Sequence, residues 1–204
     1  MQKPNDYEQV QAYGEFTPLK LGGHICRIMQ VEETRSTTGK DMLKISLDIA
    51  EGDQKGYFEQ QYKSDTRSDK KWGCVVYQLI HDANGGTNRG FKSFVTSAEN
   101  SNPNFKAAWG NNFAACFKDK LIGGVFGREQ YLNQAGEKKL ATKCFFFRSA
   151  DAIRAGVEVP EDRLLPENSG YNTGYAPGYM PVPGTDGFMN IPDGSIGNDE
   201  LPFL

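Results

Sequence analysis

Patterns of apolar and polar residues typical of strands occupy residues 22–64. GGHICRIMQVEETRS, at residues 22–36, is rich in β-branched and apolar residues, which is typical of a long strand. In DMLKISLDIAEG, at residues 41–52, every second position from 43 to 49 is apolar, so the segment predicts a half-buried strand. A Gly- and Asp-rich turn then leads to YFEQQYKS, residues 57–64, which we interpret as a third strand of a meander.

The period then changes to that of a helix. In residues 69–85 the apolar side chains recur at i, i+3, i+4 and i+7, which predicts a helix with one buried stripe. Residues 91–98 repeat this spacing, and residues 102–117 favour a third helix. Trp72 and Trp109 fall on these stripes, where core packing is the usual role of such residues; stacking against a ligand is the less favoured alternative.

Two further strands are predicted at residues 121–132 and 140–149, followed by a short helix at 150–155. The order β-β-β, helices, β-β predicts a mainly β protein with inserted helices. A five-stranded OB-type barrel has this layout, and other small α+β folds also satisfy it. We expect an irregular lead-in at 1–20 and a barrel domain at 21–163, with a helical insertion at about 69–119.

The last part of the chain has a different composition. From residue 166 onward, 39 residues contain six Pro and seven Gly, and nothing in them is periodic enough to build a core. We therefore expect residues 164–204 to form a disordered tail. This tail has no Lys or Arg but five acidic residues, whereas residues 35–148 carry 18 Lys and Arg against 12 Asp and Glu. The net charge of −3 therefore averages over a mildly basic body and an acidic tail.

Composition narrows the class of protein. The first ten residues, MQKPNDYEQV, lack the apolar core of a secretory signal, and no run is long enough to span a membrane, so we expect an intracellular protein without membrane contact. The four cysteines are scattered, which favours reduced core thiols over a metal site. We therefore expect no metal and no cofactor. The aromatic content of 12 % would suit contacts between copies of the chain.

Catalytic signatures are missing from the sequence. It contains no GxxxxGK[ST] phosphate loop, no HExxH and no GxSxG motif. His24 falls in a predicted strand and His81 at the end of a predicted helix, which favours structural roles, and the acidic pair Glu32-Glu33 alternates across a strand. We therefore expect a binding protein rather than an enzyme.

Several motifs resemble those of phage-encoded single-stranded DNA-binding proteins. VEETRSTTGKDMLKISLDIAEGDQKGYF is similar to their first hairpin and third strand. DKLIGGVFGREQY and FFFRSADAIRAGVEVP are similar to their final strands and domain end. The resemblance covers about residues 20–163. It implies an OB-fold that coats single-stranded DNA in phage or prophage replication and recombination, in the cytoplasm of a bacterial host.

The final six residues, DELPFL, are similar to the acidic Pro-Phe tip of bacterial single-stranded DNA-binding proteins. The resemblance implies a tip that recruits replication or repair enzymes. It departs from the family in having a further residue, Leu204, after the Phe. The expected partner-binding residues are Asp199, Glu200, Leu201, Pro202, Phe203 and Leu204.

Binding to single-stranded DNA needs cations that contact phosphates and aromatic rings that stack on bases. In OB-folds the loops after the first and fourth strands flank the ligand groove, and here they are TRSTTGK and NQAGEKK. If residues 57–64 form a strand, Tyr57 and Tyr62 point to opposite faces; we favour Tyr57 on the binding face. Met42, Lys44 and Ser46 line a polar strand face that is either solvated or turned toward DNA. The candidate DNA-binding residues are Arg35, Lys40, Lys44, Tyr57, Tyr62, Lys63, Arg67, Lys70, Lys71, Arg128, Tyr131, Lys138 and Lys139.

A second interpretation of the sequence stays open. The net charge of the middle region is modest, so the same barrel could bind a protein instead of DNA, as a phage accessory interaction module. Sequence-tolerant binding to single-stranded DNA is the leading hypothesis.

Overall fold

The computed structural model describes residues 2–5, 7, 17–133 and 135–166; the expected partner-binding tip, residues 199–204, lies outside these ranges. The strands are β1 (Gly22–Arg35), β2 (Asp41–Ile49), β3 (Val75–Leu79), β4 (Leu121–Leu132) and β5 (Lys138–Arg148). The helices are α1 (Tyr57–Ser64), α2 (Arg89–Ser101), α3 (Phe113–Cys116) and α4 (Ala150–Ala155). The predicted mainly β class with inserted helices is confirmed.

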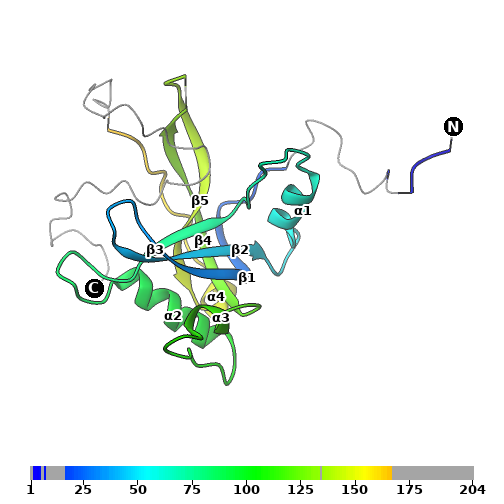
Figure 1. The fold of residues 1–204 in the computed structure, drawn as a ribbon. Helices are drawn as coiled ribbons and strands as arrows, with labels where there is room; N and C mark the ends of the chain where they lie inside the picture. Colours follow the sequence, from blue (N-terminus) through cyan, green and yellow to red (C-terminus); the bar gives the residue numbers. More distant parts are fainter. Residues whose placement is uncertain (1, 6, 8–16, 134, 167–204) are drawn as a thin grey trace.

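All five strands belong to one antiparallel sheet with the order β3-β2-β1-β4-β5. The sheet is open, because no backbone pairing within the described ranges joins its two edge strands, β3 and β5. A closed five-stranded barrel is therefore not formed. Figure 1 shows β1, β2 and β3 crossing the molecule while β4 and β5 run across them, with α2, α3 and α4 grouped on one side.

Two irregularities in strand register accompany the curvature of the sheet. The β1–β2 register shifts between Ile28 and Gln30, and the β4–β5 register shifts between Val125 and Phe126. Such bulges bend a strand and increase its twist. The inner face of the curved sheet is filled by one core, in which Phe94, Phe117 and Phe126 are the largest fully buried side chains.

The segment predicted as the third strand is a helix, so that prediction is wrong. Residues 57–64 contain helix-forming Glu, Gln and Lys, and Glu59 and Lys63 form an ion pair one helical turn apart. The helix begins after Gly56, whose φ of 73° is favourable for glycine. The buried carboxylate of Asp48 accepts a hydrogen bond from the backbone N–H of Phe58 at 2.9 Å, which satisfies one orphan donor of the first turn.

The helix predicted over residues 69–85 is also wrong, because its centre is strand β3. The two β-branched residues Val75 and Val76 favour extended backbone, and burial alternates along the strand. Trp72 lies before the strand, and its indole N–H donates a hydrogen bond to the carbonyl of Leu47 at 2.7 Å. The apolar residues predicted to form one helical stripe therefore pack in two different ways: Val76 lies in strand β3, whereas Trp72 packs before the strand begins.

Two of the remaining three helix predictions are confirmed, and the third is confirmed only in part. Helix α2 is confirmed, and Asn88 caps it by accepting hydrogen bonds from the N–H groups of Gly90 and Phe91. Helix α4 is confirmed as well. The predicted third helix shrinks to the four residues of α3, because the chain takes left-handed backbone at Asn104 and Gly110. Trp109, on this irregular segment, is 70 % exposed, so its predicted core position is wrong.

The chain after α4 returns along β4. Where β1 no longer accompanies β4, Arg163 takes its place: its N–H donates to the carbonyl of Arg128 at 2.9 Å, and its carbonyl accepts from the N–H of Gln130 at 2.8 Å. None of the helices in the described ranges is long and apolar enough to cross a membrane.

Candidate nucleic-acid interface

The outer face of β2 and β3 brings a cation next to an aromatic ring. Lys44 on β2 is directly opposite Tyr77 on β3 and Glu32 on β1. Residues paired in this way point to the same face of a sheet. Ser46 continues that face beside Val75. Of the polar face predicted for β2, Lys44 and Ser46 are half-exposed, whereas Met42 is buried.

Lys44 does not present a free charge on this face. Its ammonium is 3.1 Å from the carboxylate of Glu32, and both side chains are partly exposed. A surface ion pair of this kind stabilises by only about 0–1 kcal/mol, so a phosphate can displace Glu32 at modest cost. The pair nevertheless makes the centre of the face electrically neutral.

The loop between β1 and β2 is short and internally bonded. The N–H of Ser36 donates to the carbonyl of Lys40 at 2.8 Å, and Gly39 takes positive φ. Arg35, at the start of the loop, pairs with Asp41 at 2.9 Å. The loop therefore holds Lys40 exposed at its end.

Helix α1 and the segment after it gather a second aromatic group. The rings of Tyr62 and Trp72 lie 5.5 Å apart, and the ammonium of Lys70 lies 4.6 Å from the Tyr62 ring centroid. Lys71 is exposed beside Lys70 and forms no ion pair with any described residue. This group offers rings and cations together, although not on a strand.

The other candidates near α1 are engaged by the protein itself. Lys63 pairs with Glu59 at 2.6 Å. Arg67 pairs with Asp65 at 2.6 Å, and its hydrogen bonds lower the pKa of that carboxyl to about 2. Tyr57 is half-buried: its hydroxyl accepts a hydrogen bond from the N–H of Leu19 at 3.0 Å, and burial raises its pKa. Its predicted place on a strand face is therefore wrong.

The β4–β5 hairpin carries the last candidates. Tyr131 is directly opposite Lys139, whose ammonium is 3.1 Å from Glu137. Arg128 pairs with Asp162 at 2.7 Å. Lys138 is exposed and, among the residues that the structure describes, has no ion-pair partner.

The predicted residues therefore form three groups: the β2 face with its loop, the α1 group and the β4–β5 hairpin. Six of the predicted cations are held in ion pairs, which was not foreseen from the sequence. These are Arg35, Lys44, Lys63, Arg67, Arg128 and Lys139.

Sequence reasoning missed two aromatic positions. Tyr77 was overlooked because its segment was interpreted as a helix, although the alternation in VVYQL indicates a strand. Phe146 is not among the predicted binding residues, and it is 42 % exposed, between the buried Phe145 and Phe147. The guanidinium of Arg163 lies 3.8 Å from the Phe145 ring centroid and 5.6 Å from that of Phe146. No sequence spacing reveals this last contact.

The described residues hold no cluster of three or more His, Cys, Asp or Glu side chains that could bind a metal ion. Cys26, Cys74 and Cys144 are buried, Cys116 is half-buried, and all four are free thiols. In comparisons with known proteins, the chain matches no protein-family model and no curated protein sequence.

Proposed function

We propose that the protein is a sequence-tolerant single-stranded DNA-binding protein whose open sheet is a variant OB-type barrel. The order of the strands supports this fold assignment. β1 lies between β2 and β4, the two edge strands are β3 and β5, and α2 follows β3 and packs against β3, β4 and β5. Joining the two edges would complete a five-stranded barrel of the OB type, a fold that is often only partly closed.

The observation that carries the function is the pair formed by Lys44 and Tyr77. In OB-folds the face of the second and third strands binds oligonucleotides. On that face, a lysine directly beside a half-exposed tyrosine supplies the two elements that sequence-tolerant binding needs, a phosphate contact and a stacking ring. Tyr62, Lys70 and Trp72 provide a second such group.

The protein acts in this proposal by coating unpaired strands during phage or prophage replication and recombination, in the cytoplasm of the host. It catalyses no reaction. Residues 199–204 recruit replication or repair enzymes, and exposed rings such as Phe146 allow self-association. These roles rest on the sequence resemblance and on composition.

The alternative function is an OB-type module that binds protein. The observation that favours it is the neutralisation of six candidate cations by neighbouring acids. Such a surface attracts phosphates less than the sequence count of lysines and arginines indicates.

Fluorescence anisotropy with labelled oligo-dT separates the two functions. The DNA-binding function requires saturable binding that weakens as salt increases, because phosphate contacts release counterions. Absence of binding in dilute buffer would favour the protein-binding module.

A further inference from the structure

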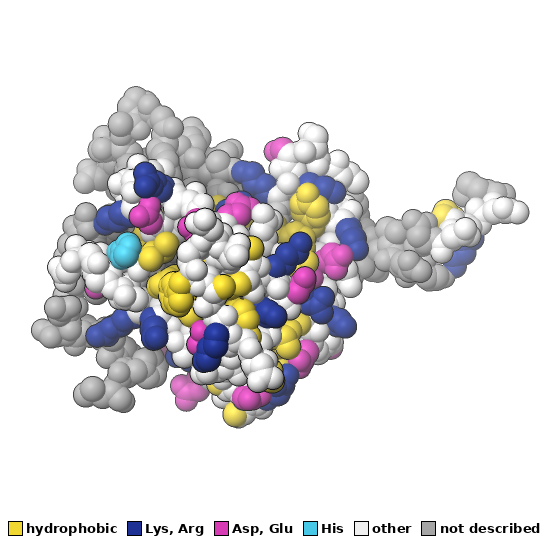
Figure 2. All heavy atoms as spheres, turned by 60° about the horizontal axis from the view of Figure 1, so that its bottom comes forward, with side chains coloured by type: hydrophobic (Ala, Val, Ile, Leu, Met, Phe, Trp, Pro, Cys, Tyr) yellow, Lys and Arg dark blue, Asp and Glu magenta, His cyan; other side chains and the backbone are white. Residues whose placement is uncertain are grey.

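A second surface, where α2 meets the ends of β3 and β5, carries rings and cations outside the β2–β3 face. Figure 2 shows this side of the molecule, where hydrophobic side chains gather near the centre and both basic and acidic side chains lie around them. Two hollows flank α2, and both are lined by Lys92.

The first hollow is apolar and lies beside Trp109. It has a volume of about 410 Å³ and is lined by Ile80, His81, Thr87, Phe91, Lys92, Val95 and Trp109. The Trp109 ring stacks on Phe113, with ring centroids 4.9 Å apart and an interplanar angle of 21°. This stack fixes the orientation of the indole while leaving 70 % of the residue exposed. Trp109 is therefore an oriented aromatic platform open to solvent.

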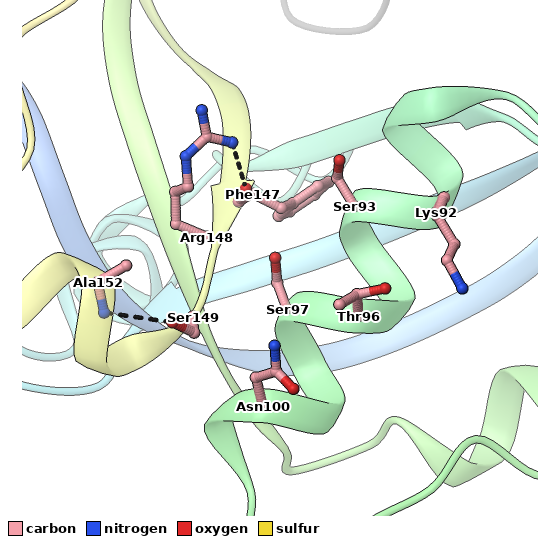
Figure 3. A pocket seen from close by; sticks show the side chains of 9 residues that line it. All are labelled: Lys92, Ser93, Thr96, Ser97, Asn100, Phe147, Arg148, Ser149 and Ala152. Atoms are coloured by element: carbon pink, nitrogen blue, oxygen red, sulfur yellow. Dashed lines mark hydrogen bonds between the residues drawn. The ribbon is translucent and has the colours of Figure 1, made fainter. Parts of the chain in front are cut away.

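The second hollow is polar and lies between α2 and the end of β5. It has a volume of about 370 Å³ and is lined by Lys92, Ser93, Thr96, Ser97, Asn100, Phe147, Arg148, Ser149 and Ala152. In Figure 3, Ser93 and Ser97 lie on the side of α2 that faces Phe147, and Lys92 projects away from β5. Hydroxyls, an amide and two cations are the groups that bind phosphate oxygens.

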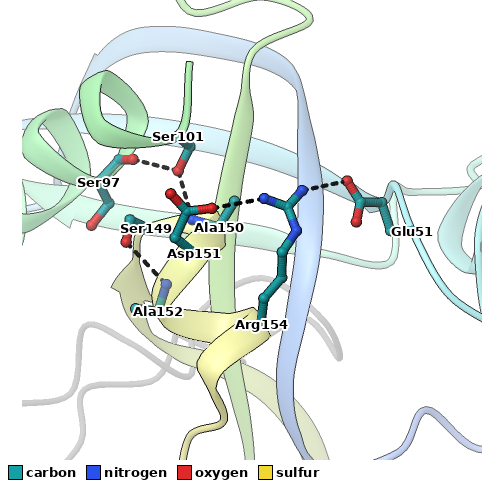
Figure 4. Close-up of polar contacts among 8 residues, drawn as sticks. All are labelled: Glu51, Ser97, Ser101, Ser149, Ala150, Asp151, Ala152 and Arg154. Carbon is teal, nitrogen blue, oxygen red and sulfur yellow. Dashed lines mark hydrogen bonds and ion pairs between the residues drawn. The ribbon is translucent and has the colours of Figure 1, made fainter. Parts of the chain in front are cut away.

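The polar hollow is built on fixed backbone. The hydroxyl of Ser149 accepts a hydrogen bond from the N–H of Ala152 at 3.2 Å (Figure 4). The hydroxyl of Ser101 accepts from the N–H of Ala150 at 2.9 Å and donates to the carbonyl of Ser97 at 2.6 Å. The bond between Ala150 and Ser101 ties the start of α4 to the end of α2, the two helices beside the hollow.

Beyond the polar hollow lies another exposed ring. The guanidinium of Arg148 is 5.9 Å from the ring centroid of Phe146, which is 42 % exposed. Along the surface, an aromatic ring, a cation, a polar hollow, a second cation and a second ring thus follow one another. Cations that track the backbone, combined with aromatic rings on which bases stack, are the groups that bind single-stranded nucleic acid.

Charge complementarity identifies the class of occupant. No Asp or Glu lines either hollow, whereas Lys92 and Arg148 do. Glu99, also on α2, is occupied by Lys106 at 3.1 Å and by the N–H of Ala107 at 3.1 Å. We propose that this surface, from Trp109 across Lys92 to Arg148 and Phe146, is a second binding site for single-stranded nucleic acid. The inference rests on the proposed function and extends it to a surface outside the β2–β3 face.

The test compares variants in binding to an oligo-dT of about 30 nucleotides, longer than the ~4–16 nucleotides that one OB-fold occupies. We expect Trp109→Ala to weaken binding at least about fivefold, the low end for one stacked base, and Trp109→Phe to retain most of it. Lys92→Ala should reduce the slope of log K against log salt by about 0.7. Lys55→Ala, which removes an exposed cation outside this surface, is the matched control and should leave the affinity unchanged.

A second readout observes Trp109 directly. In a Trp72→Phe variant, Trp109 is the one remaining tryptophan, and oligo-dT should quench its emission. If the wild type binds oligo-dT, and if Trp109→Ala and Lys92→Ala bind it with the same affinity and the same salt slope, the second site is overturned while the proposed function stays intact. A peptide of residues 198–204 that shifts Trp109 emission when oligo-dT does not would also overturn it, in favour of a peptide site. If the wild type binds no oligonucleotide at all, the proposed function fails and the second site fails with it.

Discussion

Lys44 and Glu32 form an ion pair of 3.1 Å across β2 and β1, on the face where Lys44 also lies opposite Tyr77. The lysine that is best placed to contact a phosphate is therefore the one that an acid neutralises. If the protein binds DNA as proposed, its affinity depends on this acidic residue as well as on the basic one.

Glu32→Gln should strengthen binding to oligo-dT. The variant removes the negative charge from the face and frees Lys44, so one more phosphate contact becomes available and the salt slope should increase by about 0.7. Anisotropy titrations at several salt concentrations measure both quantities. Glu33→Gln, at the exposed neighbouring position, is the matched control. Equal affinities for Glu32→Gln and wild type would show that DNA does not contact this face.

Tyr77→Ala should weaken oligo-dT binding by about 1–3 kcal/mol, the contribution of one stacked base, whereas Tyr77→Phe should preserve most of the affinity because it keeps the ring. Circular dichroism and thermal unfolding of both variants verify that the fold persists. A loss of affinity in Tyr77→Phe as large as in Tyr77→Ala would mean that the hydroxyl rather than the ring is recognised.

Asp48 should stabilise the start of α1. Its carboxylate accepts hydrogen bonds from the N–H groups of Phe58 at 2.9 Å and Ile49 at 2.8 Å. Asp48→Ala leaves both buried donors unsatisfied, so we expect a loss of about 1–3 kcal/mol in the free energy of unfolding, measured with urea. Asp48→Asn keeps an acceptor and should lose less.

The pH dependence of these variants has a definite sign. Burial raises the pKa of Asp48, so the folded protein binds the proton more tightly than the unfolded chain does. The contribution of Asp48 to stability is therefore largest at low pH and falls as the pH rises through its folded pKa. Lowering the pH from neutral to about 4 should stabilise wild type relative to Asp48→Asn. Relative destabilisation on acidification would contradict this assignment.

The thiols should differ sharply in reactivity. Burial raises the pKa of Cys144 to about 12 and those of Cys26 and Cys74 well above the ordinary value, so these three remain protonated and inaccessible in the native protein. The half-buried Cys116 should react first with a thiol reagent. Cys116→Ser should abolish the first phase of labelling in the native protein, and denaturation should expose all the remaining thiols. Early modification of Cys144 in wild type would contradict the packed core.

Removal of residues 198–204 should separate two activities. We expect the shortened protein to bind oligo-dT as tightly as the full chain, because the deletion removes no cation and no described ring. Capture of replication or repair enzymes from a bacterial host should be lost. A matched variant that replaces only Asp199 and Glu200 by Asn and Gln tests whether the acids contribute to capture. Reduced DNA affinity after the deletion would contradict this division of roles.

Segments with a clear strand or helix pattern could be predicted from the sequence, because the spacing of their apolar residues matches the positions that are buried in the structure. This holds for β1, β2, β4 and β5, and for α2 and α4. The exchange of strand and helix around residues 57–80 could not be predicted, because it depends on distant contacts. Asp48 supplies an acceptor to the start of α1, and Leu47 supplies one to the indole of Trp72.

The sequence indicated which Lys and Arg residues belong to the candidate site, but it did not show which acidic residues form ion pairs with them. Glu59 and Lys63 have the helical spacing of an ion pair, but this became meaningful only once residues 57–64 were found to be a helix. Arg128 and Asp162 are far apart in sequence and meet only because the chain returns along β4. Tyr77 could have been identified from the sequence, because VVYQL alternates as a strand does, but its segment was predicted to be a helix.

The salt dependence of oligo-dT binding tests the central claim most directly. Anisotropy titrations of the full chain at about 50 and 200 mM salt should give saturable binding that weakens steeply, with a slope that corresponds to several phosphate contacts. Absence of binding at the lower salt concentration, or an affinity that does not change between the two, would contradict the account.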